Sequence, residues 1–361
     1  MTLNTRNLSV LVGLLISCFC LWLFLRGINW EELTRALHEA NYIYVVPAVL
    51  ITLVTYVVRT ARWELLILPI KKVSFMNVFS AMTIGFMANH LLPARAGEII
   101  KCVVLGKTES IRTTGIFATV IMERLLDSVS LIIFATVIIA IITPHTGGQI
   151  YTDTQASLNT ANDNLHIFDQ LKEGIGILGG VCLVIIVFLV FLDIYSQKVI
   201  DLTGRTISFM PHAVTDRILH LLESLVRGMR VLKNARQVLW ISFLSFSLWI
   251  LFATGMVILG YSFGIEISFA AMSFVLVCMS LAIALPQAPA YIGVFHLVVQ
   301  KSLELFHVSP VAAQSFAIVL WAVSVFTSII IGTLFLWKEG LSFGQIIKAR
   351  KTVDQDAVNG E

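Results

Sequence analysis

Charged residues are scarce in this chain, and their scarcity defines its class. Only 13% of its 361 residues are Asp, Glu, Lys or Arg, while 57% are hydrophobic. A soluble domain, by comparison, carries about 25% charged residues. The formal net charge of +3 is too small to indicate a nucleic-acid partner. The composition therefore predicts an integral membrane protein.

Motifs for cofactor or metal chemistry are missing as well. The sequence contains no complete phosphate-binding glycine loop and no HExxH pair. Its five cysteines fall in or beside apolar runs without metal or disulfide spacing, so we interpret them as packing residues. They are Cys18, Cys20, Cys102, Cys182 and Cys278. The sequence therefore predicts a protein without a cofactor or a bound metal.

Apolar runs of about 20 residues, the length that a membrane-spanning helix needs, recur along the chain. They fall near 8–25, 43–66, 115–142, 174–194, 238–260 and 311–337. We interpret the first run as a transmembrane helix because it is long and lacks a small-residue cleavage site. Two further apolar stretches, 75–92 and 268–285, end in Pro-containing breaks. The pattern predicts an all-α fold with about six full transmembrane helices.

The distribution of Lys and Arg predicts how the chain is oriented. These residues gather in 59–72, in 195–237 and in the tail, whereas 144–173 carries one Lys against four acidic residues. By the positive-inside rule, the basic segments and both termini are cytoplasmic and 144–173 is extracytoplasmic. We therefore expect a multi-pass protein of the cell inner membrane.

Six full spans leave two segments that must return to the side from which they enter. These are 75–112, entering from the cytoplasm, and 261–309, entering from outside. We predict that each is a Pro-broken re-entrant hairpin and that the two form inverted repeats, as in many transporters. The alternative is that Pro and Gly simply end ordinary spans.

The domain organisation is expected to be simple. Residues 1–340 form one polytopic membrane domain, and 341–361 form a short cytoplasmic tail. Within the domain, 212–236 alternates apolar and basic residues, which predicts an amphipathic helix along the inner leaflet.

The strongest functional signal is the charged, Pro- and Gly-broken segment 89–101. Lipid offers no hydrogen-bond partner to unpaired backbone groups or to a guanidinium. Such a segment therefore lies inside protein or beside a water-filled cavity. Arg95, Glu98 and Lys101 are spaced by three, and we expect them to form one stripe of a helix that begins just after Pro93. A helix N-terminus with an adjacent Arg can bind a phosphate. The alternative is an ordinary cytoplasmic loop.

A pair of arginines closes the second predicted span. Arg59 and Arg62 lie one helical turn apart and precede Trp63, which we expect to anchor the helix at the membrane interface. We expect the arginines to contact a ligand headgroup. The alternative is that they are positive-inside flanking residues that snorkel to the surface.

Three ionisable residues, Glu123, Arg124 and Asp127, interrupt the apolar run 116–142. A membrane helix turns such groups toward the interior of its bundle. We expect them to pair with Arg95, Lys101 or Arg59 and so to position an anion-binding arginine. The alternative is a structural latch without ligand contact.

In combination these features resemble the flippase-like proteins of the lysylphosphatidylglycerol synthase transmembrane-region family. The similar residues are Arg59-x-x-Arg62-Trp63, Gly85 to Asn89, Pro93-x-Arg95-x-Gly97-Glu98 with Lys101, Glu123-Arg124-x-x-Asp127, and the break from Pro286 to Gly293. The chain departs from the family's late pattern, Pro-Gly-Gly-x-Gly-x-x-Glu, where it has Ala290 and His296. The resemblance implies the translocating part of such proteins, which we expect without the soluble aminoacyl-transfer domain.

We therefore expect a lipid translocase, not an enzyme, that moves a phospholipid or a lipid-linked polar headgroup between leaflets. Its substrate would be an anionic, aminoacylated, hopanoid-type or polyprenyl-linked lipid, with a separate lipid-modifying enzyme as a further partner. The expected site comprises headgroup contacts (Arg59, Arg62, Asn89, Arg95, Glu98, Lys101), a charge network (Glu123, Arg124, Asp127), helix breaks (Pro93, Gly97, Pro286, Pro289, Gly293) and polar lining (His90, His296).

Two other functions fit parts of the pattern. One is a membrane glycosyltransferase using a polyprenyl-phosphate sugar, with Glu31, Glu32 and Glu39 after the first span as its carboxylates. The other is a scaffold that docks a lipid-modifying synthase through 212–236.

Overall fold

The computed structural model describes residues 5–92, 95–149, 180, 234–284, 287–342 and 344, and this part of the chain is helical without strands. Four of its helices are long and apolar enough to cross a membrane. The α-helices are α1 (Thr5–Arg26), α2 (Trp30–Glu39), α3 (Val45–Ile67), α4 (Phe75–Leu91), α5 (Gly97–Glu109), α6 (Thr113–Gln149), α10 (Ala235–Gly260), α11 (Phe269–Ala284), α12 (Val294–Glu304) and α13 (Pro310–Lys338). Three short 3-10 helices join them: η1 (Tyr42–Tyr44), η3 (Tyr261–Phe263) and η4 (Pro289–Tyr291).

Five of the six predicted apolar spans fall on single helices. The long helices α6, α10 and α13 contain the windows 115–142, 238–260 and 311–337, and the window 43–66 falls on α3 with the end of η1 before it. The first window lies in α1, which joins α2 at a bend of 86° and counts with it as a fifth candidate span. Asn29 stands at this bend and caps α2 by accepting from the Glu32 backbone N–H at 3.4 Å. This is the usual role of Asn at a helix start.

Helices α4 and α5 form a closely packed pair. A Cβ atom on Gly97 would lie 1.9 Å from the carbonyl oxygen of Gly85, so only glycine allows this approach. At 1.5 Å per residue the two helices are about 26 and 20 Å long, less than the roughly 30 Å thickness of a bilayer core. Helix α4 is apolar all round and buried from Ser80 to Ala88, as expected for a helix surrounded by others.

Helices α11 and α12 form a second short pair, about 24 and 16 Å long on the same basis. Between them, Gly293 has a φ of 90°, and a Cβ there would lie 2.2 Å from the carbonyl oxygen of Ser17 in α1. The Ser17 hydroxyl also accepts from the Ala288 backbone N–H at 2.8 Å. Ala290 adopts a left-handed φ of 55°, a conformation that glycine adopts without steric cost.

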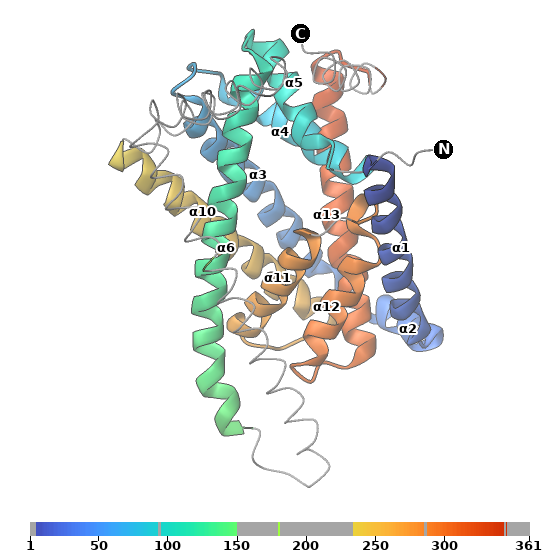
Figure 1. Ribbon diagram of the computed structural model, residues 1–361. Coiled ribbons are helices and arrows are strands. Elements are labelled where there is room, and N and C mark those ends of the chain that lie inside the picture. Colours follow the sequence, from blue (N-terminus) through green and yellow to red (C-terminus); the bar gives the residue numbers. More distant parts are fainter. Residues whose placement is uncertain are drawn as a thin grey trace.

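The two pairs lie in opposite halves of the molecule (Figure 1). The α4–α5 pair lies in the half that holds the start of α1 and the end of α13, and the α11–α12 pair lies in the other half. Their tips meet, because the Arg95 guanidinium donates to the carbonyl oxygen of Ile283 at the end of α11. The rings of His90 and Tyr291 also pack edge to face, with centroids 5.6 Å apart.

Each pair has its own cluster of buried apolar side chains. One cluster gathers residues of α3, α4 and α5 around Trp63, Met82 and Ile100. The other gathers residues of α6 and α10–α13 around Phe274, Val299 and Phe316. Helices α3, α6, α10 and α13 supply residues to both clusters, so these long helices join the two pairs into one fold.

Some predicted segments need correction or lie outside the described residues. Helix α6 extends to Gln149, so the predicted loop 144–173 begins with helix, and Pro144 does not end α6. Outside the described residues lie most of the span 174–194, the amphipathic helix 212–236 up to residue 233, the tail from 345 on, and both Pro93 and Pro286.

Candidate functional site

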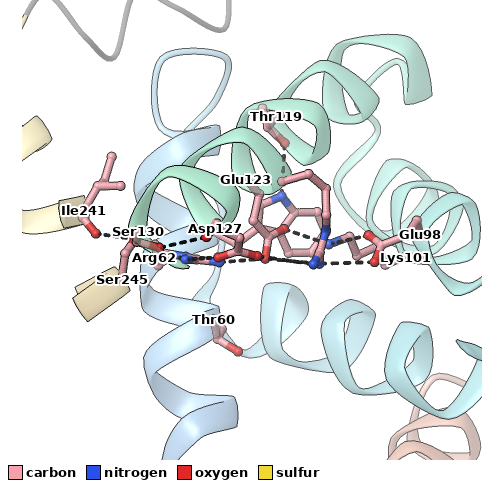
Figure 2. A network of polar contacts seen from close by, with 12 residues as sticks. Thr60, Arg62, Glu98, Lys101, Thr119, Glu123, Asp127, Ser130, Ile241 and Ser245 are labelled. Atoms are coloured by element: carbon pink, nitrogen blue, oxygen red, sulfur yellow. Dashed lines mark hydrogen bonds and ion pairs between the residues drawn. The ribbon is translucent and has the colours of Figure 1, made fainter. Parts of the chain in front are cut away.

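Glu123 is the centre of a buried charge cluster between helices (Figure 2). Its Oε1 atom accepts from Arg62 Nη2 at 3.2 Å and its Oε2 atom accepts from Lys101 Nζ at 2.7 Å. All three side chains are at most 2% exposed. A buried charge is tolerated only when it is paired and hydrogen-bonded, so each of these groups requires the others.

The cluster closes into a ring through three further residues. Lys101 also pairs with Glu98 at 3.1 Å, and Arg124 links Glu98 at 3.1 Å to Asp127 at 3.2 Å. Asp127 Oδ1 then accepts from Arg62 Nη1 at 2.5 Å. We call Arg62, Glu123, Lys101, Glu98, Arg124 and Asp127 the ion-pair ring. Positive and negative groups alternate around it, so its net charge is zero.

The ring members come from three helices, and a hydrogen bond ties the ring to a fourth. Arg62 comes from α3, Glu98 and Lys101 from α5, and the other three members from α6. Arg62 Nη1 also donates to Ser245 Oγ on α10 at 3.1 Å. The i,i+4 spacing places both acidic residues of α6 on one helix face. This face packs against Arg62 and Lys101. The predicted inward orientation is found for Glu123, which is fully buried, whereas Arg124 keeps 38% of its side chain exposed. Of the three expected partners, Lys101 pairs with Glu123.

Trp63 was expected at the membrane interface, and this expectation is wrong. Its side chain is fully buried, and its indole N–H donates to Thr119 Oγ1 at 3.0 Å. The Lys101 ammonium lies 4.9 Å from the centre of its ring, a distance at which a cation is attracted to the π-system. The buried cation therefore holds Trp63 inside the protein.

The predicted stripe of three charges after Pro93 also needs correction. Helix α5 begins only at Gly97, and Arg95 lies before it with a left-handed φ of 51°. Glu98 and Lys101 alone share the helix face. The side-chain oxygen of Asn89 accepts from the Gly97 backbone N–H at 2.8 Å, so this N–H of the helix start is already bonded within the protein.

Two arginines lie outside the ion-pair ring. The Arg59 guanidinium carbon lies 5.1 Å from the ring centres of both Phe86 and Phe252. Among the described residues, this arginine has no hydrogen-bond acceptor or carboxylate partner, and its Nε is buried. Arg95 is exposed, and its one side-chain hydrogen bond to a described residue is to the Ile283 carbonyl oxygen across the helix breaks. Because the ring is neutral, these two cations leave the region with a surplus of two positive charges.

Tyr291 lies in the same region. Its hydroxyl lies within electrostatic reach of Arg95, Arg59 and Arg124. Neither this tyrosine nor Ser245 could be assigned from the sequence, because each reaches the charges only through tertiary packing.

The two candidate histidines occupy different surroundings. His90 bonds through Nδ1 to the Phe86 carbonyl oxygen at 2.9 Å and lies beside the meeting helix tips. His296 is buried among aromatic rings, with centroids 5.3 Å from Phe24 and 5.5 Å from Trp321. The structure thus brings His90 to the charged region and leaves His296 in the apolar half. In the part of the chain that the structure describes, no group of His, Cys, Asp and Glu is arranged to hold a metal ion.

Comparisons with known proteins agree with this architecture. Residues 10–332 match the family described as the lysylphosphatidylglycerol synthase TM region. The chain is similar to UPF0104 membrane proteins of two archaea, with 27% identity over 129 residues for Methanocaldococcus jannaschii and 26% over 133 residues for Pyrococcus horikoshii. It is also similar to a glycosyltransferase, AglD, of Haloferax volcanii, with 22% identity over 333 residues.

These alignments cover 35%, 36% and 88% of this chain in that order. They span 38% of the length of each UPF0104 protein and 52% of the glycosyltransferase. No solved structure matches the chain.

Proposed function

Because the chain belongs to the lysylphosphatidylglycerol synthase transmembrane-region family, we propose that it moves a phospholipid, or another lipid with a polar headgroup, between the leaflets of the inner membrane. One observation carries this proposal: Arg59 and Arg95 lie beside an ion-pair ring whose own charges already cancel. Unpaired cations at membrane depth are costly, and an anionic headgroup offsets that cost. Arg95 engages phosphate oxygens through its planar fork.

The proposed topology has both termini in the cytoplasm and the two short helix pairs as re-entrant hairpins from opposite faces. Their lengths support it, since each helix is too short to cross the bilayer core. The headgroup would pass where the hairpin tips meet, while its acyl or prenyl chains remain in lipid. Discontinuous helices near the membrane midplane are a common site for substrates in transporters.

The contact between Arg95 and Ile283 gives a means of coupling binding to movement. A phosphate oxygen is a stronger acceptor than a neutral carbonyl, because hydrogen bonds between ionised groups are about twice as strong. A bound headgroup therefore displaces the Ile283 carbonyl from Arg95 and releases the α11–α12 pair from the α4–α5 pair. The ion-pair ring keeps α3, α5 and α6 together during this change.

We expect Arg95→Ala to reduce lipid transport at least tenfold while the folded yield stays normal, because the exposed Arg95 makes a single side-chain hydrogen bond to a described residue. The assay follows fluorescent phosphatidylglycerol, phosphatidylethanolamine and lysylphosphatidylglycerol in proteoliposomes. Native mass spectrometry of co-purified lipids, compared between the wild type and the variant, identifies the headgroup. Lys107→Ala, which removes another exposed cation of the α4–α5 pair, is the control and should transport normally. Wild-type transport by Arg95→Ala would refute the assignment of the phosphate to this residue.

A second candidate function is favoured by the similarity to the AglD glycosyltransferase. In this reading, Glu31, Glu32 and Glu39 of α2 would act on a polyprenyl-phosphate sugar at the membrane surface. Glu31 is exposed and pairs with Arg35 at 3.5 Å. Its helix α2 lies in the half of the molecule opposite the α4–α5 pair (Figure 1). If Glu31→Gln and Glu32→Gln abolished formation of a sugar-linked lipid by the purified protein, the enzyme reading would replace the translocase.

One short motif gives this enzyme reading no support. The segment Gly260–Gly264 reads Gly-x-Ser-x-Gly, but Ser262 lies in the 3-10 helix η3 directly after α10. A nucleophile elbow instead follows a strand. The scaffold reading depends on 212–236, of which the described part includes only the last three residues.

A further inference from the structure

We propose that a cavity between the ends of α1 and α12 binds the phosphate of an anionic phospholipid, in the leaflet remote from the α4–α5 pair. The cavity has a volume of about 540 Å³ and is lined by Leu23, Arg26, Gly27, Leu297 and Lys301. Both cations belong to the last turn of their helices. None of these residues takes part in the ion-pair ring or in the proposed transport site.

The charge of the cavity suits a phosphodiester. Arg26 has no carboxylate partner among the described residues, and its guanidinium lies 5.1 Å from the centre of the Trp22 ring. Lys301 pairs with Glu304 at 2.6 Å, and this carboxylate also accepts from Gln300 at 2.7 Å. Two cations and one carboxylate leave a net charge of +1, which balances the net charge of −1 of phosphatidylglycerol, whereas the choline of phosphatidylcholine already neutralises its own phosphate.

Aromatic residues around the cavity indicate its depth in the membrane. Trp22, Trp30, Tyr42 and Tyr261 have exposed side chains and belong to elements at this end of the molecule, where the Asn41 backbone N–H donates to the Ser262 carbonyl oxygen at 3.0 Å. Exposed Trp and Tyr gather at the headgroup level of a bilayer. The cations of the cavity therefore lie at the depth of lipid phosphates.

The apolar wall selects a lipid over free phosphate. Leu23 and Leu297 line the cavity, and farther along α1 the side chains of Leu15 and Phe19 are exposed. An acyl chain can follow this apolar surface from the cavity into the bilayer, while the phosphate stays between Arg26 and Lys301. Inorganic phosphate would leave the leucines without a partner.

Photo-crosslinking in nanodiscs tests the site. We use phosphatidylglycerol with a diazirine in its acyl chain, and the same probe with a phosphatidylcholine headgroup, and locate the labelled peptides by mass spectrometry. Phosphatidylglycerol is expected to label the peptides containing Leu23 and Leu297 about tenfold more than phosphatidylcholine does. The double variant Arg26→Gln/Lys301→Gln is expected to lose about tenfold of this labelling, a factor equal to about 1.4 kcal/mol.

Two control variants keep the test decisive. Arg35→Gln removes an exposed cation at the same end of the molecule and should label like the wild type. Arg26→Lys/Lys301→Arg keeps both charges and should retain the label even if the glutamine variant folds poorly. Equal labelling by the two probes, or full labelling of a folded glutamine variant, would overturn the site. Because Arg95 is untouched, failure of the transport assay would leave this result standing, and the reverse also holds.

Discussion

Glu123→Gln is expected to lower the free energy of unfolding by about 3–5 kcal/mol, the cost of removing one partner from a buried ion pair. The substitution leaves Arg62 and Lys101, both almost fully buried, with one carboxylate fewer between them. It also turns an amide N–H toward a cation in place of an oxygen. The midpoint of thermal unfolding in detergent micelles measures the effect.

A double-mutant cycle separates the ion pair from packing. Combining Glu123→Gln with Lys101→Met removes one charge of each sign and keeps the side-chain volumes, so the loss should be well below the sum of the single effects. Glu31→Gln serves as the control, since it breaks the exposed pair with Arg35 and should change stability by less than about 1 kcal/mol. A loss as small as this for Glu123→Gln would mean that the ion-pair ring is not held together in the membrane.

Gly97→Ala is expected to destabilise the protein by at least about 3 kcal/mol, at the upper end of the range for overpacking. The new methyl group would lie 1.9 Å from the Gly85 carbonyl oxygen and 2.6 Å from Asn89 Oδ1. The Gly85 carbonyl oxygen belongs to the backbone and cannot rotate away from the new methyl group as a side chain can. Helices α4 and α5 must therefore separate, and the hydrogen bond from the Gly97 N–H to Asn89 is lost. Thermal unfolding and the yield of monodisperse protein both report this change.

Gly115→Ala is the matched control in this case. A Cβ there would meet only Ile70 Cδ1, at 3.9 Å, and alanine favours helix by up to about 1 kcal/mol relative to glycine. We therefore expect a midpoint equal to or above that of the wild type. If Gly97→Ala behaved in the same way, the close approach of α4 and α5 could not be a feature of the native protein.

Helix positions could be predicted from the sequence because each long apolar run satisfies its own backbone hydrogen bonds locally. The exact partners in the ion-pair ring could not be predicted from the sequence. Arg59 and Arg62 share a helix face, and the rotation of α3 against α6 decides which of them meets Glu123. This rotation depends on the packing of side chains such as Trp63, whose burial only the assembled protein reveals.

The helix start after Pro93 shows a similar limit. The spacing of three residues predicted that Arg95, Glu98 and Lys101 share one helix face. This interpretation assumed that the helix begins before Arg95. The Asn89 side chain caps the helix at Gly97 instead, so the chain turns at Arg95 and directs it to the other helix pair. A cap supplied by a side chain of the preceding helix cannot be predicted from the residues next to the helix start.

In electrical terms, the ion-pair ring is a body of zero net charge that can shift within the membrane field without doing electrical work. One elementary charge carried across a potential of 100 mV changes the free energy by about 2.3 kcal/mol. Only Arg59 and Arg95 contribute to such work when this region moves, and a monoanionic headgroup bound to them cancels one of their two charges. The membrane voltage therefore acts on a net charge of two when the region is empty and on a net charge of one when a headgroup is bound.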